Sequence, residues 1–284
     1  MTWTITASLD EFRAAAGEYL AAHPAENTAL LTIADRLERN GLNAFGAQPP
    51  RFGWWRPRPD APVDGVFLQT PPYPPRLGRT PVGAGAALAD ALHARGEALA
   101  AVSGGKAAAL AFAERWQRLT GAEPAVRTDE RLYRLDGLTP PSPAPEGRFR
   151  LARSADRELL IEWLTAFVAE AGVMEPDLDA AAIVDQRIAE RSWHVWESAG
   201  RPVSFAGASP VIAGMSRIGP VYTPPEHRRN GYAGAVVAGA SAHAVAEGAG
   251  EVLLYTDLAN PTSNSVYQKL GYRPVEDCIV LDLN

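Results

Sequence analysis

The sequence predicts a mixed α/β protein built from two similar domains in tandem. Three observations predict it. A β-rich segment beginning at Ser216 leads through a tight loop into a helical pattern, the two halves of the chain begin and end alike, and a proline-rich stretch separates them. With 284 residues, 46% of them hydrophobic, the chain is long enough for two domains that each bury a core.

The proline-rich stretch, TPPSPAPE, covers residues Thr139–Glu146 and has no apolar periodicity. Such a composition is typical of an extended linker, because proline fixes φ and offers no N–H to a helix or sheet. We therefore expect one domain over residues 1–138, a linker over residues 139–146 and a second domain over residues 147–284.

The two halves carry similar patterns at both ends. Each begins with a short strand, a serine two residues before an aspartate and a helical pattern, which predicts N-caps at Ser8 and Ser154. Each ends with an aromatic residue, Gln, a cation and Leu, then Gly, Pro and a last strand containing Leu-Asp, in Glu114–Leu138 and Ser265–Asn284. An internal duplication explains this best.

Composition excludes several function classes. The net charge is -6, and residues 147–284 hold 12 basic against 17 acidic residues, which argues against nucleic acid and favours small cationic substrates. No apolar run is long enough to span a membrane and no secretory signal opens the chain, so we expect a cytoplasmic protein without membrane contact. The single cysteine, Cys278, and five scattered histidines predict no metal site.

The stretch HRRNGYAGAV, residues 227–236, predicts an anion-binding turn. Pro224 and Pro225 end the preceding strand, and small apolar residues recur at helical spacing after the glycine. The free N–H groups and positive dipole end of that helix would point into a loop that carries Arg228 and Arg229. Gly231 would let the backbone approach a ligand, so a diphosphate suits the site.

Two other nucleotide-binding interpretations fail. The loop does not read G-x-G-x-x-G, and no acidic residue follows in the frame of a dinucleotide fold. The segment Ala101–Leu110 is similar to a phosphate-binding P-loop, but Ala100 stands in place of its first glycine and Ala107 in place of its Ser or Thr.

The loop resembles the coenzyme A loop of the GCN5-related N-acetyltransferase (GNAT) superfamily, R/Q-x-x-G-x-G/A. Its six places are filled by Arg228, Arg229, Asn230, Gly231, Tyr232 and Ala233. The stretch DLANPTSNSVYQKLGYRPV resembles a second GNAT signature. The matching residues are Asn260, Tyr267, Leu270, Gly271 and Tyr272. The resemblance covers about Arg148–Asn284 and reaches the first half only through the duplication. It therefore implies a tandem GNAT protein with a degenerate amino-terminal copy, similar to a group of bacterial predicted acetyltransferases.

The resemblance implies a mostly antiparallel twisted sheet flanked by helices in each domain, with acetyl-CoA bound by the second. A strand bulge near Gly219 and Pro220 would free the N–H groups of Val221 and Thr223 to hold pantetheine and polarise the acetyl carbonyl. The cofactor-binding residues it implies are Val221, Tyr222, Thr223, Arg228, Arg229, Asn230, Gly231, Tyr232, Ala233, Asn260 and Ser263.

The resemblance makes Tyr267 the general acid. An unperturbed tyrosine is protonated at pH 7 and can donate to a departing thiolate. Structural roles remain open for two of these residues, because Tyr267 also fits a core aromatic and Asn260 before Pro261 also fits a helix N-cap. The general base is undecided, and its candidates are Glu170, Glu175, Asp177, His194 and Glu197.

The function expected from this resemblance is acetyl-CoA-dependent N-acetyl transfer to a primary amine of a small-molecule acceptor by direct attack, with a homodimer left open. One alternative is a non-catalytic acyl-CoA binding or sensing protein, which would not need an acid at Tyr267. Another is an acyltransferase that uses a longer acyl-CoA.

Overall fold

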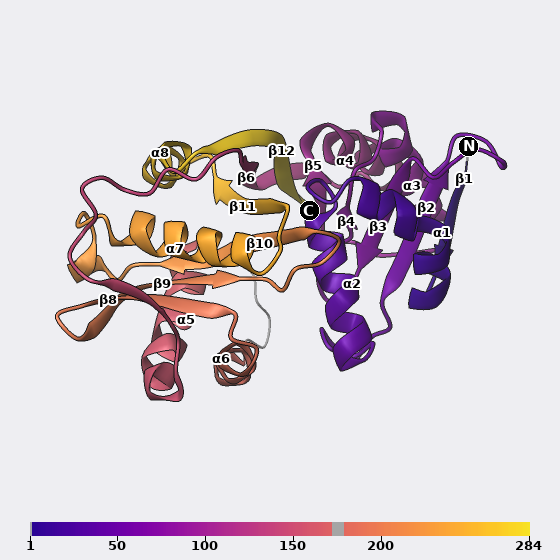
Figure 1. Ribbon diagram of the computed structural model, residues 1–284. Helices are drawn as coiled ribbons and strands as arrows, with labels where there is room; N and C mark the ends of the chain where they lie inside the picture. The colour runs from indigo at the N-terminus through magenta and orange to yellow at the C-terminus, as the bar shows by residue number, and fades with distance from the viewer. Residues whose placement is uncertain (1, 172–178) are drawn as a thin grey trace. The chain divides into compact units, whose positions relative to one another are not determined.

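The structure is a computed structural model that describes residues 2–171 and 179–284 (Figure 1). The chain forms two compact units, each assembled from separate stretches of sequence. Unit 1 comprises Met1–Leu132, Thr256–Asn260 and Pro274–Asn284, and unit 2 comprises Tyr133–Tyr255 and Pro261–Arg273.

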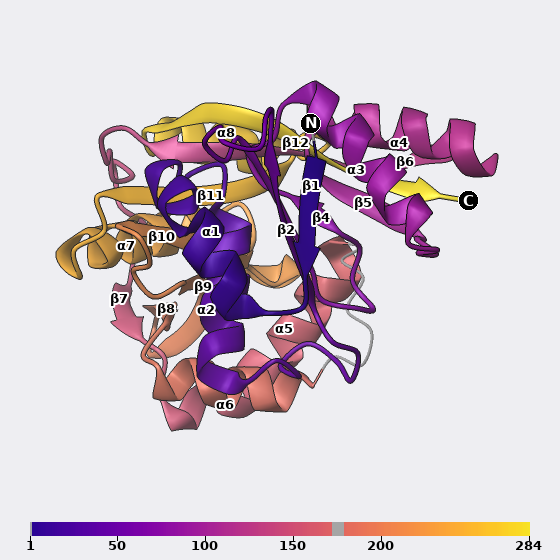
Figure 2. The same ribbon diagram turned by 90° about the vertical axis from the view of Figure 1, so that its right-hand side faces the viewer.

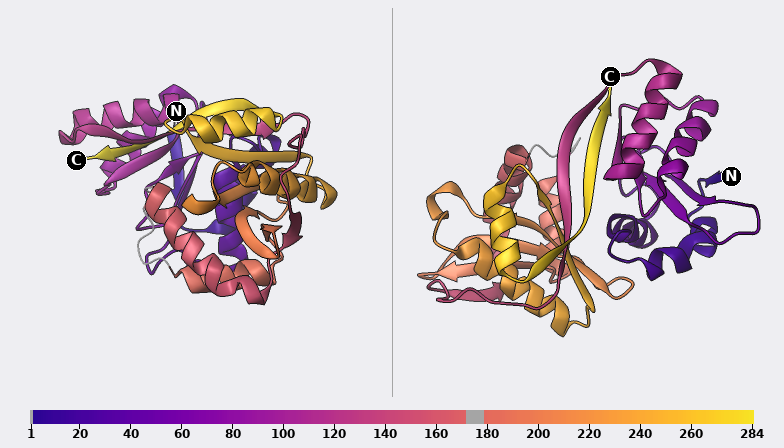
Figure 3. Two further views of the ribbon diagram at one scale, coloured as in Figure 1. Left: turned by 90° about the vertical axis from the view of Figure 1, so that its left-hand side faces the viewer. Right: turned by 90° about the horizontal axis from the view of Figure 1, so that it is seen from above.

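The described residues of unit 1 form four helices and a sheet with the strand order β1-β2-β3-β4-β5-β12-β6. The helices are α1 (Leu9–Ala22), α2 (Thr28–Asn40), α3 (Val82–Ala94) and α4 (Lys106–Thr120). The strands are β1 (Thr2–Thr6), β2 (Arg51–Arg56), β3 (Gly65–Gln69), β4 (Arg76–Leu77), β5 (Ala101–Gly105), most of β6 (Pro124–Leu135) and most of β12 (Tyr272–Leu283). Figure 3 shows β6 in magenta running beside the yellow β12.

The helices of unit 1 lie in pairs on the two faces of its sheet (Figure 2). Successive residues of β3 show why, because side chains alternate between faces along a strand. Val66 and Leu68 pack in the core that α1 and α2 cover, whereas Phe67 packs in the core that α3 and α4 cover. All three side chains are almost fully buried, so β3 is a central strand with two covered faces.

Unit 2 repeats this plan with the strand order β6-β11-β10-β9-β8-β7. Its helices are α5 (Arg157–Ala171), α6 (Ala180–Ala189), α7 (Tyr232–Ala246) and α8 (Pro261–Lys269), with short 3-10 helices η1 (Ser154–Asp156) and η2 (Pro225–His227). Its strands are β7 (Arg148–Leu151), β8 (Trp193–Ser198), β9 (Arg201–Ala208), β10 (Met215–Tyr222) and most of β11 (Glu251–Asp257), with the last residues of β6 and the first of β12.

The sheet of unit 2 also separates two cores. Helices α5 and α6 cover one face, where Trp163, Trp193 and Phe205 pack together. Helices α7 and α8 cover the other face, where Val236 and Tyr272 are completely buried. The fold class expected from sequence, a mixed α/β protein with largely antiparallel sheets flanked by helices, is confirmed.

The elements follow the same order in both halves of the chain. Each half runs strand, helix, helix, strand, strand, strand, helix, strand, helix and long strand, apart from the two 3-10 helices of the second half. The fourth and fifth strands of each half, β4 with β5 and β10 with β11, are parallel neighbours joined by a helix. The similar ends noted in the sequence thus belong to equivalent elements.

One of the two predicted N-caps is confirmed and the other is wrong. Ser8 caps α1, because its side chain accepts a hydrogen bond from the backbone N–H of Glu11 at 3.2 Å. Ser154 instead lies inside η1, where Arg153 occupies the cap position and donates its N–H to the Asp156 carboxylate at 2.8 Å. The side-chain oxygen that accepts a backbone N–H at this helix start therefore comes from Asp156, whereas the sequence pattern predicts it from Ser154.

Across the described residues, 2–171 and 179–284, no helix combines the length and the apolar character needed to cross a lipid bilayer.

Candidate functional site

The bulge expected in the strand before the arginine loop is present in β10. Against β9, the register of β10 shifts between Ile218 and Val221. Against β11, the parallel pairing ends at Ile218 opposite Leu254. In the part of the chain that the structure describes, Val221 and Thr223 therefore lie beyond the last residue pair with β11. Strands that separate in this way leave backbone groups free for a ligand.

The loop after β10 ends in a helix N-terminus with free donors. Gly231 is the N-cap of α7 and has φ +79°, a left-handed conformation that glycine adopts without steric cost. Among described residues, no protein acceptor binds the backbone N–H of Tyr232, Ala233 or Gly234. Arg229 also has a positive φ, +66°. The first turn of α7 thus presents unpaired N–H groups, and the helix dipole favours an anion there.

The two arginines of this loop differ in their contacts. Arg228 donates Nε to the Thr223 carbonyl at 2.9 Å and Nη2 to Glu170 Oε2 at 2.5 Å. Arg229 is exposed, and no ion pair to its side chain exists among the residues described. Asn230 donates its side-chain amide to the carbonyls of His227 and Arg228, at 3.2 and 3.1 Å. Asn230 therefore stabilises the turn, and Arg229 forms no ion pair with any residue that the structure describes.

Tyr222 and Thr223 are held from the neighbouring strand. The Ser204 hydroxyl on β9 donates to the Tyr222 carbonyl at 3.0 Å and lies 2.8 Å from Thr223 Oγ1. Ser204 is completely buried. No local sequence pattern marks Ser204, because only the register of β9 against β10 brings it to the end of the bulged strand.

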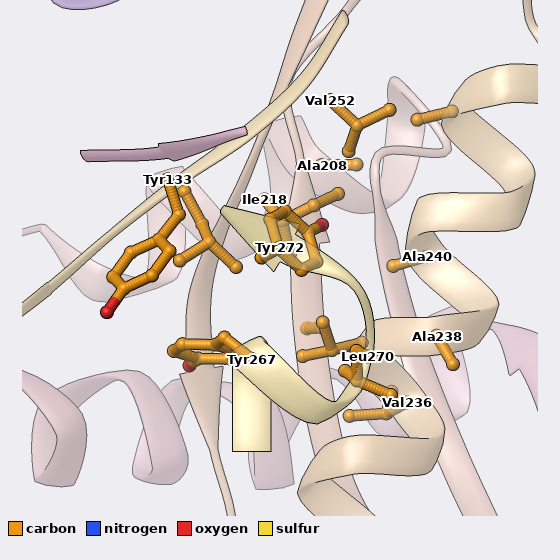
Figure 4. Packing of buried hydrophobic residues seen from close by; sticks show 14 of the residues in the cluster. Tyr133, Ala208, Ile218, Val236, Ala238, Ala240, Val252, Tyr267, Leu270 and Tyr272 are labelled. Carbon is orange, nitrogen blue, oxygen red and sulfur yellow. The ribbon is translucent and has the colours of Figure 1, made fainter. Parts of the chain in front are cut away.

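Tyr267, the expected general acid, lies on α8 and is 8% exposed. Its ring packs edge-on against Tyr272 with centroids 6.2 Å apart, and Figure 4 shows it beside Leu270. Burial raises the pKa of Tyr267 to about 12, although a hydrogen bond with Ser263 acts in the opposite direction. The phenol therefore keeps its proton at neutral pH, as a proton donor must.

Ser263 and Asn260 belong to the start of α8. Ser263 lies in the first turn and forms a hydrogen bond with Tyr267, whereas Asn260 directly precedes the helix. The N–H of Asn260 donates to the Asp257 carbonyl at 3.1 Å, and both residues belong to unit 1. The structure therefore brings Ser263 and Tyr267 together within unit 2 and assigns Asn260 to the other unit.

Tyr133 fixes α8 from the strand side and was not singled out in the sequence. Its hydroxyl donates to Asn264 Oδ1 at 2.9 Å and accepts from Gln268 Nε2 at 3.0 Å. Tyr133 is completely buried, and Figure 4 shows its ring near that of Tyr267. It lies 131 residues before Asn264, so no local pattern could have revealed the pair.

Two of the general-base candidates are committed to ion pairs. Hydrogen bonds from Arg150 and Arg148 lower the pKa of Glu197. Burial alone would raise the pKa of Glu170, but hydrogen bonds from Arg228 and Tyr222 outweigh it, so the pKa lies below its ordinary value. A carboxylate with a lowered pKa is a weaker base, which makes both residues poor candidates in this arrangement.

The third described candidate, His194, is completely buried on β8. Its ring stacks on Phe149 with centroids 5.0 Å apart and meets His243 of α7 edge-on at 4.8 Å. Burial lowers the pKa of His194 to about 4, and repulsion from His243 contributes a smaller part of this shift. A histidine without solvent access fits a core role better than proton exchange with a substrate. The remaining candidates, Glu175 and Asp177, lie outside the described residues.

The proline-rich stretch passes along the helices of unit 2 (Figure 1). The Thr139 N–H donates to the Leu270 carbonyl after α8 at 2.9 Å. A Cβ placed on Gly234 would lie 3.6 Å from Pro141, and one on Gly231 would lie 3.9 Å from Pro145. The stretch expected to be a linker therefore contacts the first turn of α7, beside the free N–H groups.

Comparison with known proteins agrees with this geometry. Residues 157–272 match the model of the acetyltransferase (GNAT) family. That span begins with α5 and ends as β12 begins, so it contains the bulged strand, the arginine loop, α7 and Tyr267. None of the curated proteins matches the chain significantly.

Several solved structures share the fold over nearly the whole chain. A GNAT-family acetyltransferase from Colwellia psychrerythraea has 10% identity and a TM-score of 0.63, with 100% of both chains covered. A GCN5-related N-acetyltransferase from Sphaerobacter thermophilus has 20% identity and a TM-score of 0.63, with 98% of this chain and 94% of the other covered. A Drosophila protein has 14% identity and a TM-score of 0.66, with 99% and 98% covered. The family match over residues 157–272 and the fold shared with these structures agree with the resemblance seen in the motifs.

Proposed function

We propose that the protein transfers an acetyl group from acetyl-CoA to a primary amine of a small molecule in the cytoplasm. One observation carries the proposal. The pairing of β10 with β11 ends at Ile218, and the same strand leads directly into a helix N-terminus that has free N–H groups and two arginines. An open strand edge suits an extended amide-containing chain, and the helix start suits a diphosphate.

The residues present fit coenzyme A. Backbone groups of Val221 and Thr223 would hold the pantetheine arm, and the first turn of α7 would hold the diphosphate. Arg229 would add charge-assisted hydrogen bonds, because its guanidinium is exposed. Acetyl-CoA would supply the activated acyl thioester. The bulge N–H groups would stabilise negative charge on the acyl oxygen.

Tyr267 would provide the proton for the departing sulfur. Its Oη carries a proton at neutral pH, because burial holds the pKa at about 12. The surrounding packing against Tyr272 and the hydrogen bond with Ser263 limit the motion of the phenol. A fixed donor loses little entropy when it meets its acceptor.

The first half of the chain would be a copy that has lost the chemistry. The shared element order supports a duplication. The position equivalent to Tyr267 in α4 is Trp116, which has no acidic hydroxyl and stacks on Phe112 with ring centroids 5.7 Å apart. We propose that unit 1 has a structural role and does not transfer acetyl groups.

A thermal-shift measurement tests the cofactor. A ligand present at 100 times its dissociation constant stabilises the folded state by about 2.7 kcal/mol, so acetyl-CoA is expected to raise the melting temperature by several degrees. A panel of primary amines, followed by the release of free thiol, then tests the reaction. If acetyl-CoA left the melting temperature unchanged at millimolar concentration, the proposal would be wrong. Cofactor binding with no thiol release from any amine would favour the acyl-CoA sensor instead.

A further inference from the structure

Arg228 already holds an anion that belongs to the protein. Its Nη2 donates to Glu170 Oε2 at 2.5 Å, and its Nε donates to the Thr223 carbonyl at 2.9 Å. The guanidinium and the carboxylate are 44% and 47% exposed. Part of the guanidinium edge that could bind a phosphate is thus in use before any ligand arrives.

Glu170 is held from a second side as well. Its Oε1 accepts a hydrogen bond from the hydroxyl of Tyr222 at 2.9 Å. The Tyr222 ring is buried and packs against Trp163, with ring centroids 6.4 Å apart. The carboxylate at the end of α5 is therefore fixed by β10 and by the arginine loop together. Because its pKa is lowered, it is an anion at neutral pH.

A carboxylate and a phosphate compete for the same donors. Both accept from the N–H groups of a guanidinium, and both carry negative charge, so they repel each other at one site. Arg229, the next residue in the loop, has no ion pair among the residues described. A diphosphate approaching α7 would therefore meet one available arginine and one that a carboxylate already neutralises.

We propose that Glu170 is an internal counter-ion that competes with the diphosphate of the acyl-CoA for Arg228 and so lowers the affinity of the site. The inference rests on the proposed function, because it assigns the diphosphate to this loop. Binding replaces the Glu170 carboxylate by the diphosphate at Arg228. The affinity therefore depends on the difference between the free energies of these two interactions. Tyr222 keeps the displaced carboxylate nearby, so the exchange reverses when the ligand leaves.

Calorimetric titration of the full chain with coenzyme A and with pantetheine, which lacks the phosphates, tests the competition. Glu170→Gln is expected to tighten coenzyme A binding by up to about fivefold, the range of a partly exposed ion pair, and to leave pantetheine binding unchanged. Glu162→Gln is the matched control, since Glu162 is exposed on the same helix and the change in net charge is identical. It is expected to change neither affinity.

A second pair of variants tests the partner. In an Arg228→Met background, Glu170→Gln is expected to have a much smaller effect on coenzyme A binding, because only the repulsion between the carboxylate and the phosphate is left to remove. Tyr222→Phe removes only the hydroxyl that anchors the carboxylate, and a smaller tightening is expected. Weaker or unchanged coenzyme A binding in Glu170→Gln would overturn the inference, as would equal tightening of coenzyme A and pantetheine. Failure of the unsubstituted protein to bind coenzyme A would instead overturn the proposed function.

Discussion

The loop between the fourth strand and the third helix differs sharply between the two units. In unit 1 this loop joins β4 to α3, and protein groups use its polar atoms. The N–H of Gly78 donates to the Val66 carbonyl at 2.9 Å, the N–H of Arg79 donates to the buried Asn27 side chain at 2.8 Å, and the Thr80 hydroxyl donates to Val66 at 3.1 Å. These three groups of the loop are therefore satisfied within the protein.

In unit 2 the equivalent loop, between β10 and α7, carries two arginines and leads into the N–H groups of Tyr232, Ala233 and Gly234, which no acceptor among the described residues binds. Gly231 and Arg229 take left-handed conformations, whereas Pro81 at the start of α3 is extended with φ -62°. The same fold thus supports a closed loop in unit 1 and, in unit 2, the open loop to which the proposed function assigns an anion. The comparison teaches that the difference lies in the residues of one short loop, because the strands and helices around it are equivalent.

The largest effect is expected from the aromatic position on the last helix. Tyr267→Phe removes the acidic proton and is expected to lower kcat by about 10²–10⁴, with the affinity for coenzyme A unchanged. Thiol-release kinetics on a reactive amine and calorimetry measure the two quantities. Trp116→Phe, the matched change in unit 1, is expected to leave kcat unchanged. A fully active Tyr267→Phe variant would remove the catalytic difference between the units.

Acid is expected to destabilise unit 2 more than unit 1. The folded-state pKa of His194 is about 4, below its ordinary value of 6.5, so between these values the unfolded chain binds a proton that the folded chain does not. The free energy of unfolding should therefore be highest above pH 6.5 and fall by about 3 kcal/mol on acidification to pH 4. Urea unfolding at each pH measures this free energy. His194→Phe should reduce the slope of the unfolding free energy against pH. An unchanged slope in that variant would contradict the assignment.

The arginine loop gives the next effect. Arg228→Ala is expected to weaken coenzyme A binding about tenfold, because a charge-assisted hydrogen bond of about 1.5–3 kcal/mol is lost while the release of Glu170 offsets part of it. Arg79→Ala, in the closed loop of unit 1, should leave the affinity unchanged. Calorimetry on both variants measures the contrast. Equal losses in the two variants would mean that the closed loop also contributes to binding.

The last pair of effects, on stability alone, concerns the two loop glycines. A Cβ on Gly78 would lie 2.4 Å from the Asn27 side chain, so Gly78→Ala is expected to cost about 1–3 kcal/mol of stability. A Cβ on Gly231 would meet only Pro145 at 3.9 Å, so Gly231→Ala should cost about 1 kcal/mol through its positive φ. Urea unfolding measures both. A larger loss of stability in Gly231→Ala than in Gly78→Ala would mean that the loop of unit 1 has room for a Cβ at Gly78.

Local features of the site could be predicted from the sequence. Prolines mark where β10 ends, and a glycine followed by small apolar residues marks where α7 begins, because each effect acts within a few residues. The two GNAT signatures work in the same way, since each occupies one continuous stretch.

Contacts between distant residues could not be predicted in this way. Glu170 and Arg228 are 58 residues apart, and only the packing of α5 beside β10 joins them. Tyr133 reaches α8 from the end of β6, and Ser204 reaches Thr223 through the register of β9. Ser154 was misassigned because the nearby Asp156 offers a stronger acceptor. A single sequence without homologues carries no signal for such pairs.

The last strand of the chain sets the order in which the protein can mature on the ribosome. Residues Pro274–Asn284 belong to unit 1, where Cys278 to Asp282 pair with β5. Although most of unit 1 is synthesised first, its strand β5 gains this neighbour only after unit 2 has been translated. A nascent chain therefore carries an unpaired strand edge throughout translation of unit 2, and chaperones that mask such edges should bind stalled chains more than released ones.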